Sequence, residues 1–303
     1  MSGAPSTAPG CYRHPSRETY IRCARCERPI CPDCMHDASV GHQCPECVAE
    51  GRRTQRPART AFGGSRVGQA GLATRILIAI NALVFVISAL SGGARALGGS
   101  GGFFGMLGAS TPVTLWGEVL GYAPYYQGGP VHGIAAGEWY RLFTAMFLHY
   151  GVLHILLNMW VLWQLGRYLE ARLGPARFVA LYLLAGLGGN VAAYLFTPPN
   201  QGAAGASTAI FGLFAAIIIV NRRLKLDISA LIPLLVINLL FTFTVPHISV
   251  AGHLGGLVTG GVVGLILAYA PPTRRTPFQV AGCTAVLVLL VVASLVRTAA
   301  LLG

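Results

Sequence analysis

Charged side chains are scarce in this chain of 303 residues: only 11% are Asp, Glu, Lys or Arg, and Lys225 is the only lysine. About a quarter of an ordinary soluble chain is charged, so this shortage excludes a typical soluble domain and a charge-rich disordered chain. Hydrophobic residues instead make up 54% of the sequence, and the mean hydropathy is +0.60. This balance predicts a membrane protein.

Long hydrophobic runs are missing before Leu72, so we expect no cleavable signal peptide there. From Leu72 onward, apolar runs alternate with polar joints, and most runs are long enough to cross about 30 Å of hydrocarbon. We predict seven membrane spans, at about 72–90, 142–165, 176–196, 207–221, 228–246, 250–270 and 278–297. The predicted regions are 1–50, a cysteine-rich domain; 51–71, a basic linker; 72–270, the main membrane domain; and 271–303, a joint with the seventh span.

The net charge of +12 would indicate a nucleic-acid partner in a soluble protein, but here the basic residues follow the joints. All but three of the 22 Lys and Arg lie at or before Arg75 or in the second, fourth and sixth joints. Because Lys and Arg collect in cytoplasmic loops, we predict a cytoplasmic N-terminus and an external C-terminus. We therefore expect no nucleic-acid partner, and a basic linker that contacts anionic lipid. The arginine-dominated composition indicates a bacterial plasma membrane.

Seven of the eight cysteines lie in the first 50 residues, and with His14 they form four pairs separated by two residues. The pairs are Cys11/His14, Cys23/Cys26, Cys31/Cys34 and Cys44/Cys47. A structural Zn²⁺ takes four thiolate or imidazole ligands, so eight ligands fill two sites. Disulfides are the alternative, but a cytoplasmic location favours metal binding. His36 and His42 are spare ligand candidates.

The cysteine spacing resembles that of B-box-like zinc fingers. This resemblance implies cross-braced pairing, with Cys11, His14, Cys31 and Cys34 on one ion and Cys23, Cys26, Cys44 and Cys47 on the other. The family usually ends its ligand set with histidines, so the last cysteine pair is a departure. Closed sites leave no open position for catalysis, and we expect a structural module whose candidate partner is a cytosolic protein.

Polar side chains are costly inside a span and mark candidate functional positions. The second predicted span contains His149, His154 and Asn158, the fourth opens at Ser207, and the sixth contains His253. A helical rise of 1.5 Å per residue from the basic span ends places Ser207, His253 and the His154/Asn158 pair in the outer half of the bilayer. Each residue alone is equally typical of helix packing. Together they supply a nucleophile, a base and oxyanion donors for acyl transfer.

Two further features bear on such a site. No Asp or Glu occurs at that depth in the predicted spans to orient the imidazole, which predicts a Ser-His dyad. Glycines recur at every fourth position from Gly252 to Gly264 and form a groove for a neighbouring helix backbone. This groove is expected to bring the predicted base close to a second span.

Four motifs resemble those of the rhomboid family of intramembrane serine proteases. They are Glu138-Trp139-Tyr140-Arg141, His149-x4-His154-x3-Asn158, Gly205-x-Ser207 and His253-x2-Gly256-x3-Gly260. The resemblance covers about 72–270 and implies an all-α polytopic fold, a six-helix bundle to which a seventh transmembrane helix is added. It also implies Ser207 as nucleophile and His253 as base, with the oxyanion held by His154, Asn158 and the Ser207 backbone N–H. The implied substrates are transmembrane proteins within the lipid bilayer.

The resemblance assigns supporting roles to His149, Gly205, Glu138 and Arg141, the last two as an ion pair or cap for the first joint. It further implies that this joint lies in the outer leaflet, and that the fifth span and a cap gate substrate entry. Thr208 departs from the glycine that commonly follows the nucleophile, and we expect an effect on substrate fit. The alternative function is a non-catalytic protein of this family that binds or escorts membrane helices.

Overall fold

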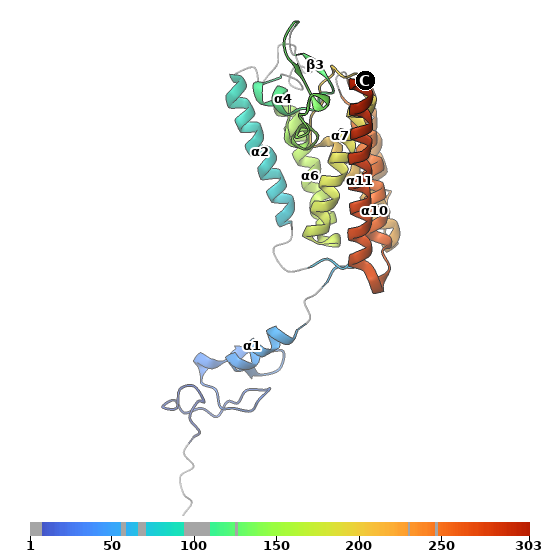
Figure 1. Cartoon of the computed structure of the whole chain (residues 1–303). Coiled ribbons are helices and arrows are strands. Elements are labelled where there is room, and N and C mark those ends of the chain that lie inside the picture. The colour runs from blue at the N-terminus through green and yellow to red at the C-terminus, as the bar shows by residue number, and fades with distance from the viewer. Residues whose placement is uncertain are drawn as a thin grey trace, which may run out of the picture. The chain divides into compact units, whose positions relative to one another are not determined.

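The computed structural model describes residues 8–55, 59–65, 71–93, 110–124, 127–229, 231–245 and 248–303. The chain forms two compact units, Met1–Pro57 and Ala58–Gly303. Figure 1 traces both units along the chain. Each unit has a hydrophobic core of its own.

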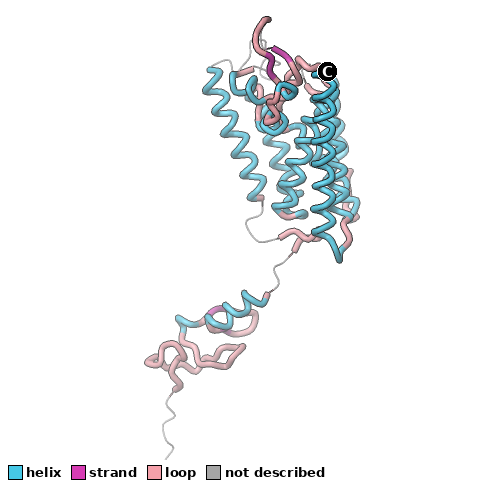
Figure 2. Tube along the Cα trace, in the orientation of Figure 1, coloured by secondary structure: helices cyan, strands magenta, loops and turns pink. Residues whose placement is uncertain are grey.

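The first unit contains little regular structure (Figure 2). Its elements are the 3₁₀ helix η1 (Pro32–Cys34), the antiparallel strands β1 (His36–Asp37) and β2 (His42–Gln43), and the helix α1 (Pro45–Thr54). Cys44 caps α1, since its Sγ accepts a hydrogen bond from the Cys47 N–H. Ile30 and the cysteines form the buried core. A unit this small buries too little apolar surface to be stable without cross-links or metal ions.

Among the residues that the structure describes, the second unit contains seven apolar helices of 14 residues or more, which confirms the prediction of an all-α polytopic membrane protein. They are α2 (Leu72–Gly92), α6 (Val152–Leu173), α7 (Pro175–Phe196), α8 (Ser207–Leu224), α9 (Leu231–Thr244), α10 (Val250–Tyr269) and α11 (Arg275–Leu302), the last preceded by η5 (Pro272–Arg274). Within the described residues, five are long and apolar enough to cross a membrane alone, and α6 qualifies together with the segment before it. The remaining helix, α9, has only 14 residues. Figure 1 shows α2 at one edge of the bundle and α11 at the other.

The predicted bounds of the second span were wrong. Instead of one helix over 142–165, the chain forms α5 (Arg141–Thr144) and η4 (Ala145–Phe147), bends by 88°, and then begins α6 at Val152. Gly151 is fully extended immediately before α6, so the helix cannot continue backwards through the bend. At its other end, α6 continues to Leu173 because its apolar face extends past Arg167. His149 therefore lies in the bend and not in the span.

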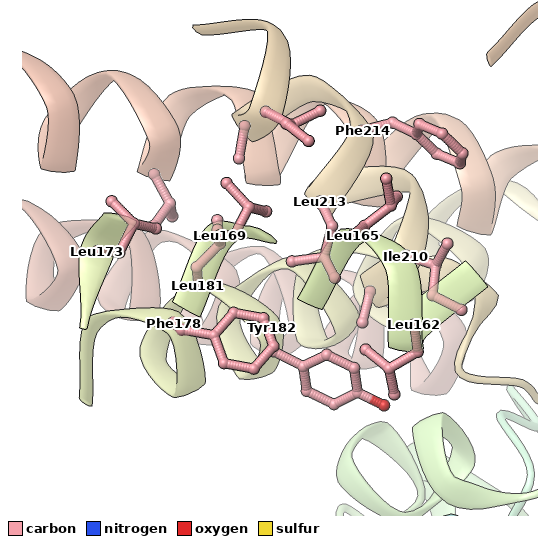
Figure 3. Close-up of a cluster of buried hydrophobic side chains, with 14 of the residues drawn as sticks. Leu162, Leu165, Leu169, Leu173, Phe178, Leu181, Tyr182, Ile210, Leu213 and Phe214 are labelled. Carbon is pink, nitrogen blue, oxygen red and sulfur yellow. The ribbon is translucent and has the colours of Figure 1, made fainter. Parts of the chain in front are cut away.

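The main core lies between α6, α7 and α8 (Figure 3). On α6 the buried leucines recur every three or four residues and share one face. Figure 3 shows these leucines meeting aromatic side chains of α7 and apolar side chains of α8; the labelled residues are Leu162, Leu165, Leu169, Leu173, Phe178, Leu181, Tyr182, Ile210, Leu213 and Phe214. This packing holds α6 and α8, which carry residues of the site described below, against α7.

Helices α8 and α10 pack with their backbones in contact, as the glycine spacing predicts. A Cβ atom added to Gly260 would lie 2.2 Å from the Cα of Gly212, and one added to Gly256 would lie 2.0 Å from the Thr208 carbonyl oxygen. No real side chain fits at such distances, so only glycine allows this approach. The first turn of α10 is thereby held against the first turn of α8.

The first joint contains short elements, although residues 94–109 and 125–126 lie outside the described part of the chain. Its elements are α4 (Pro112–Gly117), the antiparallel strands β3 (Ala123–Pro124) and β4 (Val131–His132), and η3 (Ile134–Ala136). Thr111 and Thr114 form a capping box that starts α4. The joint also pairs with the segment before α8, through an antiparallel bridge between Val119 and Ala203.

A buried carboxylate fixes the start of α2 against α6. Glu170 accepts hydrogen bonds from the backbone N–H groups of Ala73 and Thr74, at 3.0 and 2.9 Å, and from the Thr74 hydroxyl at 2.7 Å. The first N–H groups of a helix have no partner within that helix, so this carboxylate satisfies donors that burial would otherwise leave unpaired.

We therefore expect Glu170→Ala to lower the free energy of unfolding by about 3 kcal/mol, since two buried N–H groups lose a charged acceptor. Glu170→Gln keeps one oxygen acceptor and should lower the free energy of unfolding clearly less than Glu170→Ala does. The midpoint of thermal unfolding in detergent micelles, measured for both variants, tests this order. Equal losses in the two variants would contradict it.

Candidate active site

The glycine contact between α8 and α10 brings two predicted site residues together. Ser207 is the first residue of α8, and His253 lies in the first turn of α10. The Ser207 Oγ and the His253 Nε2 are 2.7 Å apart, a strong hydrogen-bonding distance. His253 is 7% exposed, and Ser207 is half-buried. A hydroxyl and an imidazole in this contact form the nucleophile and base arrangement of acyl transfer.

The ring of His253 is held by an aromatic residue that sequence reasoning missed. Phe211 stacks on the imidazole, with ring centroids 4.2 Å apart and planes inclined by 18°. It follows Ser207 by four residues on α8, so both side chains lie on one helix face. The four-residue spacing in the sequence therefore predicts that Phe211 and Ser207 share a helix face, but it does not predict that Phe211 contacts His253.

His154 lies on the other side of Ser207. Its Nδ1 accepts a hydrogen bond from the backbone N–H of Tyr150 at 3.4 Å, so the ring proton belongs on Nε2. That Nε2 lies close to Gly205 and Ser207, because a Cβ atom added to Gly205 would be 2.9 Å from it and 3.2 Å from the Ser207 Oγ. An N–H donor beside the hydroxyl is the arrangement that stabilises an oxyanion.

Two more predicted residues support His154. Asn158 is 8% exposed, and its amide donates to the His154 carbonyl oxygen at 2.8 Å, which uses one of its two N–H groups. His149, 1% exposed, packs edge-on against the His154 ring with centroids 4.9 Å apart. His154 is thus fixed in position from its own helix and from the bend before it.

Gly205 is a position where only glycine fits. Its φ of +144° is rarely adopted by other residues, and its N–H donates to the Ala145 carbonyl oxygen at 2.9 Å. The missing side chain leaves the space in which the His154 Nε2 approaches Ser207.

We expect Gly205→Ala to lower the reaction rate of Ser207 by about 10²-fold or more, because the added methyl group displaces the His154 donor from the nucleophile. The labelling rate of Ser207 with a fluorophosphonate reagent measures this. Gly93→Ala is the matched control: that glycine also has a positive φ, of 62°, but no atom of the described residues lies within 4 Å of an added Cβ. A Gly205→Ala variant as reactive as the control would contradict this role.

Glu138 and Arg141 form an ion pair in the first joint, with Nε and Oε2 2.7 Å apart. The Arg141 side chain is fully buried and also donates to the carbonyl oxygens of Leu115 and Glu118. Burial acts to raise the pKa of Glu138, but hydrogen bonds from His132, from a backbone N–H and from Arg141 outweigh it and lower that pKa. The pair therefore braces the joint and does not approach Ser207.

A second carboxylate of the joint lies near the site and was not predicted. Glu118 is 6% exposed and accepts a hydrogen bond from the Tyr150 hydroxyl at 2.6 Å. Burial raises the pKa of this carboxyl. Since the Tyr150 backbone orients His154, Glu118 connects the joint to the donor side of the site. The contact joins residues 32 positions apart, so no local pattern indicates it.

Thr208 follows Ser207 in sequence, but its side chain packs between α7 and α10. A Cβ atom added to Gly189 of α7 would be 2.6 Å from the Thr208 Cβ, and one added to Gly252 would be 3.2 Å from its methyl carbon. Two glycines thus make room for the β-branched side chain between α7 and α10. Its bulk is taken up in the helix packing.

The first unit brings the eight predicted ligands together in two groups. They are Cys11, His14, Cys31 and Cys34 in one and Cys23, Cys26, Cys44 and Cys47 in the other, with ligand atoms within 4.8 Å of one another in each. The sulfur atoms of Cys26 and Cys44 are 3.8 Å apart, and Arg28 donates to the Cys26 Sγ at 3.3 Å and lowers the pKa of that thiol. Among the described residues, His36 and His42 belong to neither group.

The bundle and the paired Ser207 and His253 define a multi-pass membrane protein with a serine-hydrolase-like site. The Rhomboid domain profile matches residues 136–270, which include both residues. The chain is 42% identical over 132 residues to "Rhomboid protease GluP" of Bacillus subtilis, and 35% identical over 139 residues to "Putative rhomboid protease YdcA" of the same organism. It is 33% identical over 152 residues to "RHOMBOID-like protein 6, mitochondrial" of Arabidopsis thaliana. The chain belongs to the rhomboid family.

These matches cover 42%, 44% and 48% of the chain, respectively. They cover 26% of GluP, 70% of YdcA and 49% of the Arabidopsis protein. All three alignments thus account for less than half of this chain, and for two of the relatives they leave at least half of the relative's own length unmatched.

Proposed function

We propose that this protein is an intramembrane serine endopeptidase that hydrolyses peptide bonds in or near transmembrane helices of membrane proteins. The observation that carries the proposal is the 2.7 Å contact between the Ser207 hydroxyl and the His253 Nε2. Membership of a family whose relatives are named as proteases supports it.

In the proposed reaction, the Ser207 Oγ attacks the carbonyl carbon of the scissile bond while the His253 Nε2 takes its proton. The oxyanion accepts hydrogen bonds from the His154 Nε2–H, from the free N–H of Asn158 and from the Ser207 backbone N–H. The last donor is available because the first N–H groups of a helix have no partner within it. His253 then protonates the leaving amine, and a water molecule hydrolyses the acyl-enzyme with the same base.

The substrate in this proposal is a transmembrane helix with weak helix propensity near its outer end, because its backbone must unwind before Ser207 can reach a carbonyl. We propose that α9 gates the entry of the substrate helix, since most of the described residues of α9 are exposed on the outside of the bundle. The distribution of basic residues supports a cytoplasmic N-terminus, which places the site near the external face.

The test is labelling of the reconstituted full chain with a fluorophosphonate reagent, followed by peptide mapping. We expect the reagent on Ser207, and parallel loss of cleavage of a single-span model substrate in the same vesicles. Labelling elsewhere with Ser207 unmodified, or cleavage that survives full labelling of Ser207, would exclude the proposed mechanism. Absence of both would instead support the non-catalytic alternative.

For the first unit we propose two structural zinc ions, one in each cluster. The donor sets, Cys₃His and Cys₄, are those of structural zinc sites. The geometry fits as well, because Zn–S bonds of about 2.3 Å in a tetrahedron place sulfurs about 3.8 Å apart, the separation between Cys26 and Cys44. With four protein ligands each, such ions would cross-link the unit and would supply no catalysis.

A further inference from the structure

More than half of the α9 side chains are exposed, and only one of its described residues is buried. Its apolar residues Val236, Leu240 and Phe241 are 46%, 58% and 54% exposed. Thr242 is only 2% exposed, and it is the one buried residue among those of α9 that the structure describes. A polar side chain is therefore the deepest contact that this loosely packed helix makes.

Thr242 reaches the proposed base. Its Oγ1 lies 2.7 Å from the His253 Nδ1, the ring nitrogen on the side opposite Ser207. The same Oγ1 is 2.8 Å from the Asn238 carbonyl oxygen, one helical turn earlier. The imidazole is thus hydrogen-bonded at both nitrogens, to α8 on one side and to α9 on the other.

The direction of these hydrogen bonds follows from the number of protons. A threonine hydroxyl has one proton and two lone pairs, and a carbonyl oxygen accepts only. The Thr242 hydroxyl therefore donates to Asn238 and must accept from His253. The Nδ1 then carries the ring proton, which leaves a lone pair on Nε2 facing the Ser207 hydroxyl. This is the tautomer that can take a proton from Ser207.

A threonine that bonds to the carbonyl one turn back is by itself ordinary in a membrane helix. Thr244 on the same helix does so too, donating to the Leu240 carbonyl oxygen at 2.7 Å, and it is exposed. Thr242 differs because its second contact is an imidazole held in place by Phe211 and Ser207. The two threonines form a matched pair for experiment.

We propose that Thr242 is a positioning residue that fixes His253 in its Nδ1–H tautomer, and that the proposed dyad is thus completed by a neutral third member from α9. The expected effect on the reaction rate of Ser207 rests on the proposed function. The expected tautomer of His253 does not. The predicted spans contain no Asp or Glu at the depth of the site, and this agrees with the proposal, because a threonine hydroxyl orients the His253 ring without placing a charge in the bilayer.

The first test is spectroscopic and does not require protease activity. In full-length protein with ¹⁵N-labelled histidine, the His253 signals, assigned by their loss in His253→Asn, should report a protonated Nδ1 and a bare Nε2. In Thr242→Val they should shift toward a mixture of the two tautomers. Unchanged shifts in Thr242→Val would overturn the proposal, whether or not the protein is an active protease.

The second test measures labelling of Ser207 with a fluorophosphonate reagent over a range of reagent concentrations. Thr242→Val should lower the limiting rate about tenfold, with the half-saturating concentration changed less than about twofold, because the ring is misoriented but the reagent site is intact. Thr242→Ser, which keeps the hydroxyl, should restore the rate to within about threefold of wild type, and Thr244→Val should behave as wild type.

Equal rates in Thr242→Val and wild type, or equal losses in the Val and Ser variants, would overturn the positioning role, since the latter result indicates a packing effect. Thermal unfolding midpoints of all variants identify any that fail to fold. If wild type itself is not labelled, the proposed function fails while the tautomer measurement still decides the role of Thr242.

Discussion

Replacing Ser207 with alanine is expected to lower peptide-bond cleavage about 10⁵-fold or more, to below detection, and to remove fluorophosphonate labelling entirely. We expect so large a loss of cleavage because the Ser207 hydroxyl contacts the His253 Nε2 at 2.7 Å, and no other described serine or threonine hydroxyl contacts that nitrogen. Cleavage of a single-span substrate in proteoliposomes, followed over time, measures the effect.

Folding must be separated from chemistry in that experiment. Ser294→Ala provides a matched control, because Ser294 is also a buried membrane serine, 2% exposed, whose hydroxyl donates to the Leu290 carbonyl oxygen of its own helix. We expect this variant to keep full activity. Residual cleavage by Ser207→Ala at a tenth of the wild-type rate would show that another group is the nucleophile.

Much of the fold is predictable because hydrophobicity and small residues leave regular patterns. Each of the seven predicted spans overlaps a helix, because apolar runs alternate with polar joints, but only five of the described helices, or six with the bent pair before and including α6, are long enough to cross a membrane. The glycines at every fourth position of α10 likewise predict a close helix contact, which α8 makes. These patterns are local and therefore visible in the sequence.

The failures have a common physical origin. The apolar residues that flank His149 predict a continuous span, but the chain bends by 88° before α6, and Gly151 is fully extended there. Phe211, Glu118 and Thr242 each act through a residue on another element. Such pairs depend on how the elements pack. The four-residue spacing of Phe211 from Ser207 indicates a shared helix face but not the residue it meets, and no local spacing indicates the contacts of Glu118 and Thr242.

The expectation for Thr208 illustrates the same limit. Its place beside Ser207 predicts an effect on substrate fit, and that stays a prediction. The β-branched side chain itself fills space left by Gly189 and Gly252, between α7 and α10. Which way a helical residue points relative to its neighbours is fixed by the bundle.

Removal of metal is expected to unfold the first unit while leaving the membrane bundle folded. Structural zinc contributes about 10 to 16 kcal/mol of apparent binding energy in small zinc domains, and that energy is folding energy. Here the buried core of residues 8–55 is Ile30 and six cysteines, with Cys26 partly buried against them, so little else stabilises the unit. Hydrogen exchange followed by mass spectrometry on the full chain should show full exchange in residues 8–55 after chelation, with α7 and α8 still protected.

The number of zinc ions bound per chain is the sharper measurement, because Cys283 lies outside both clusters and serves as a control. Metal analysis should find two zinc ions per chain in wild type and in Cys283→Ser, since Cys283 lies in α11 and belongs to neither cluster. Cys23→Ser, which removes one ligand of the Cys₄ cluster, should lower the count toward one. Fewer than two ions in wild type would contradict the two-site assignment, and loss of zinc in Cys283→Ser would show that binding does not follow the clusters.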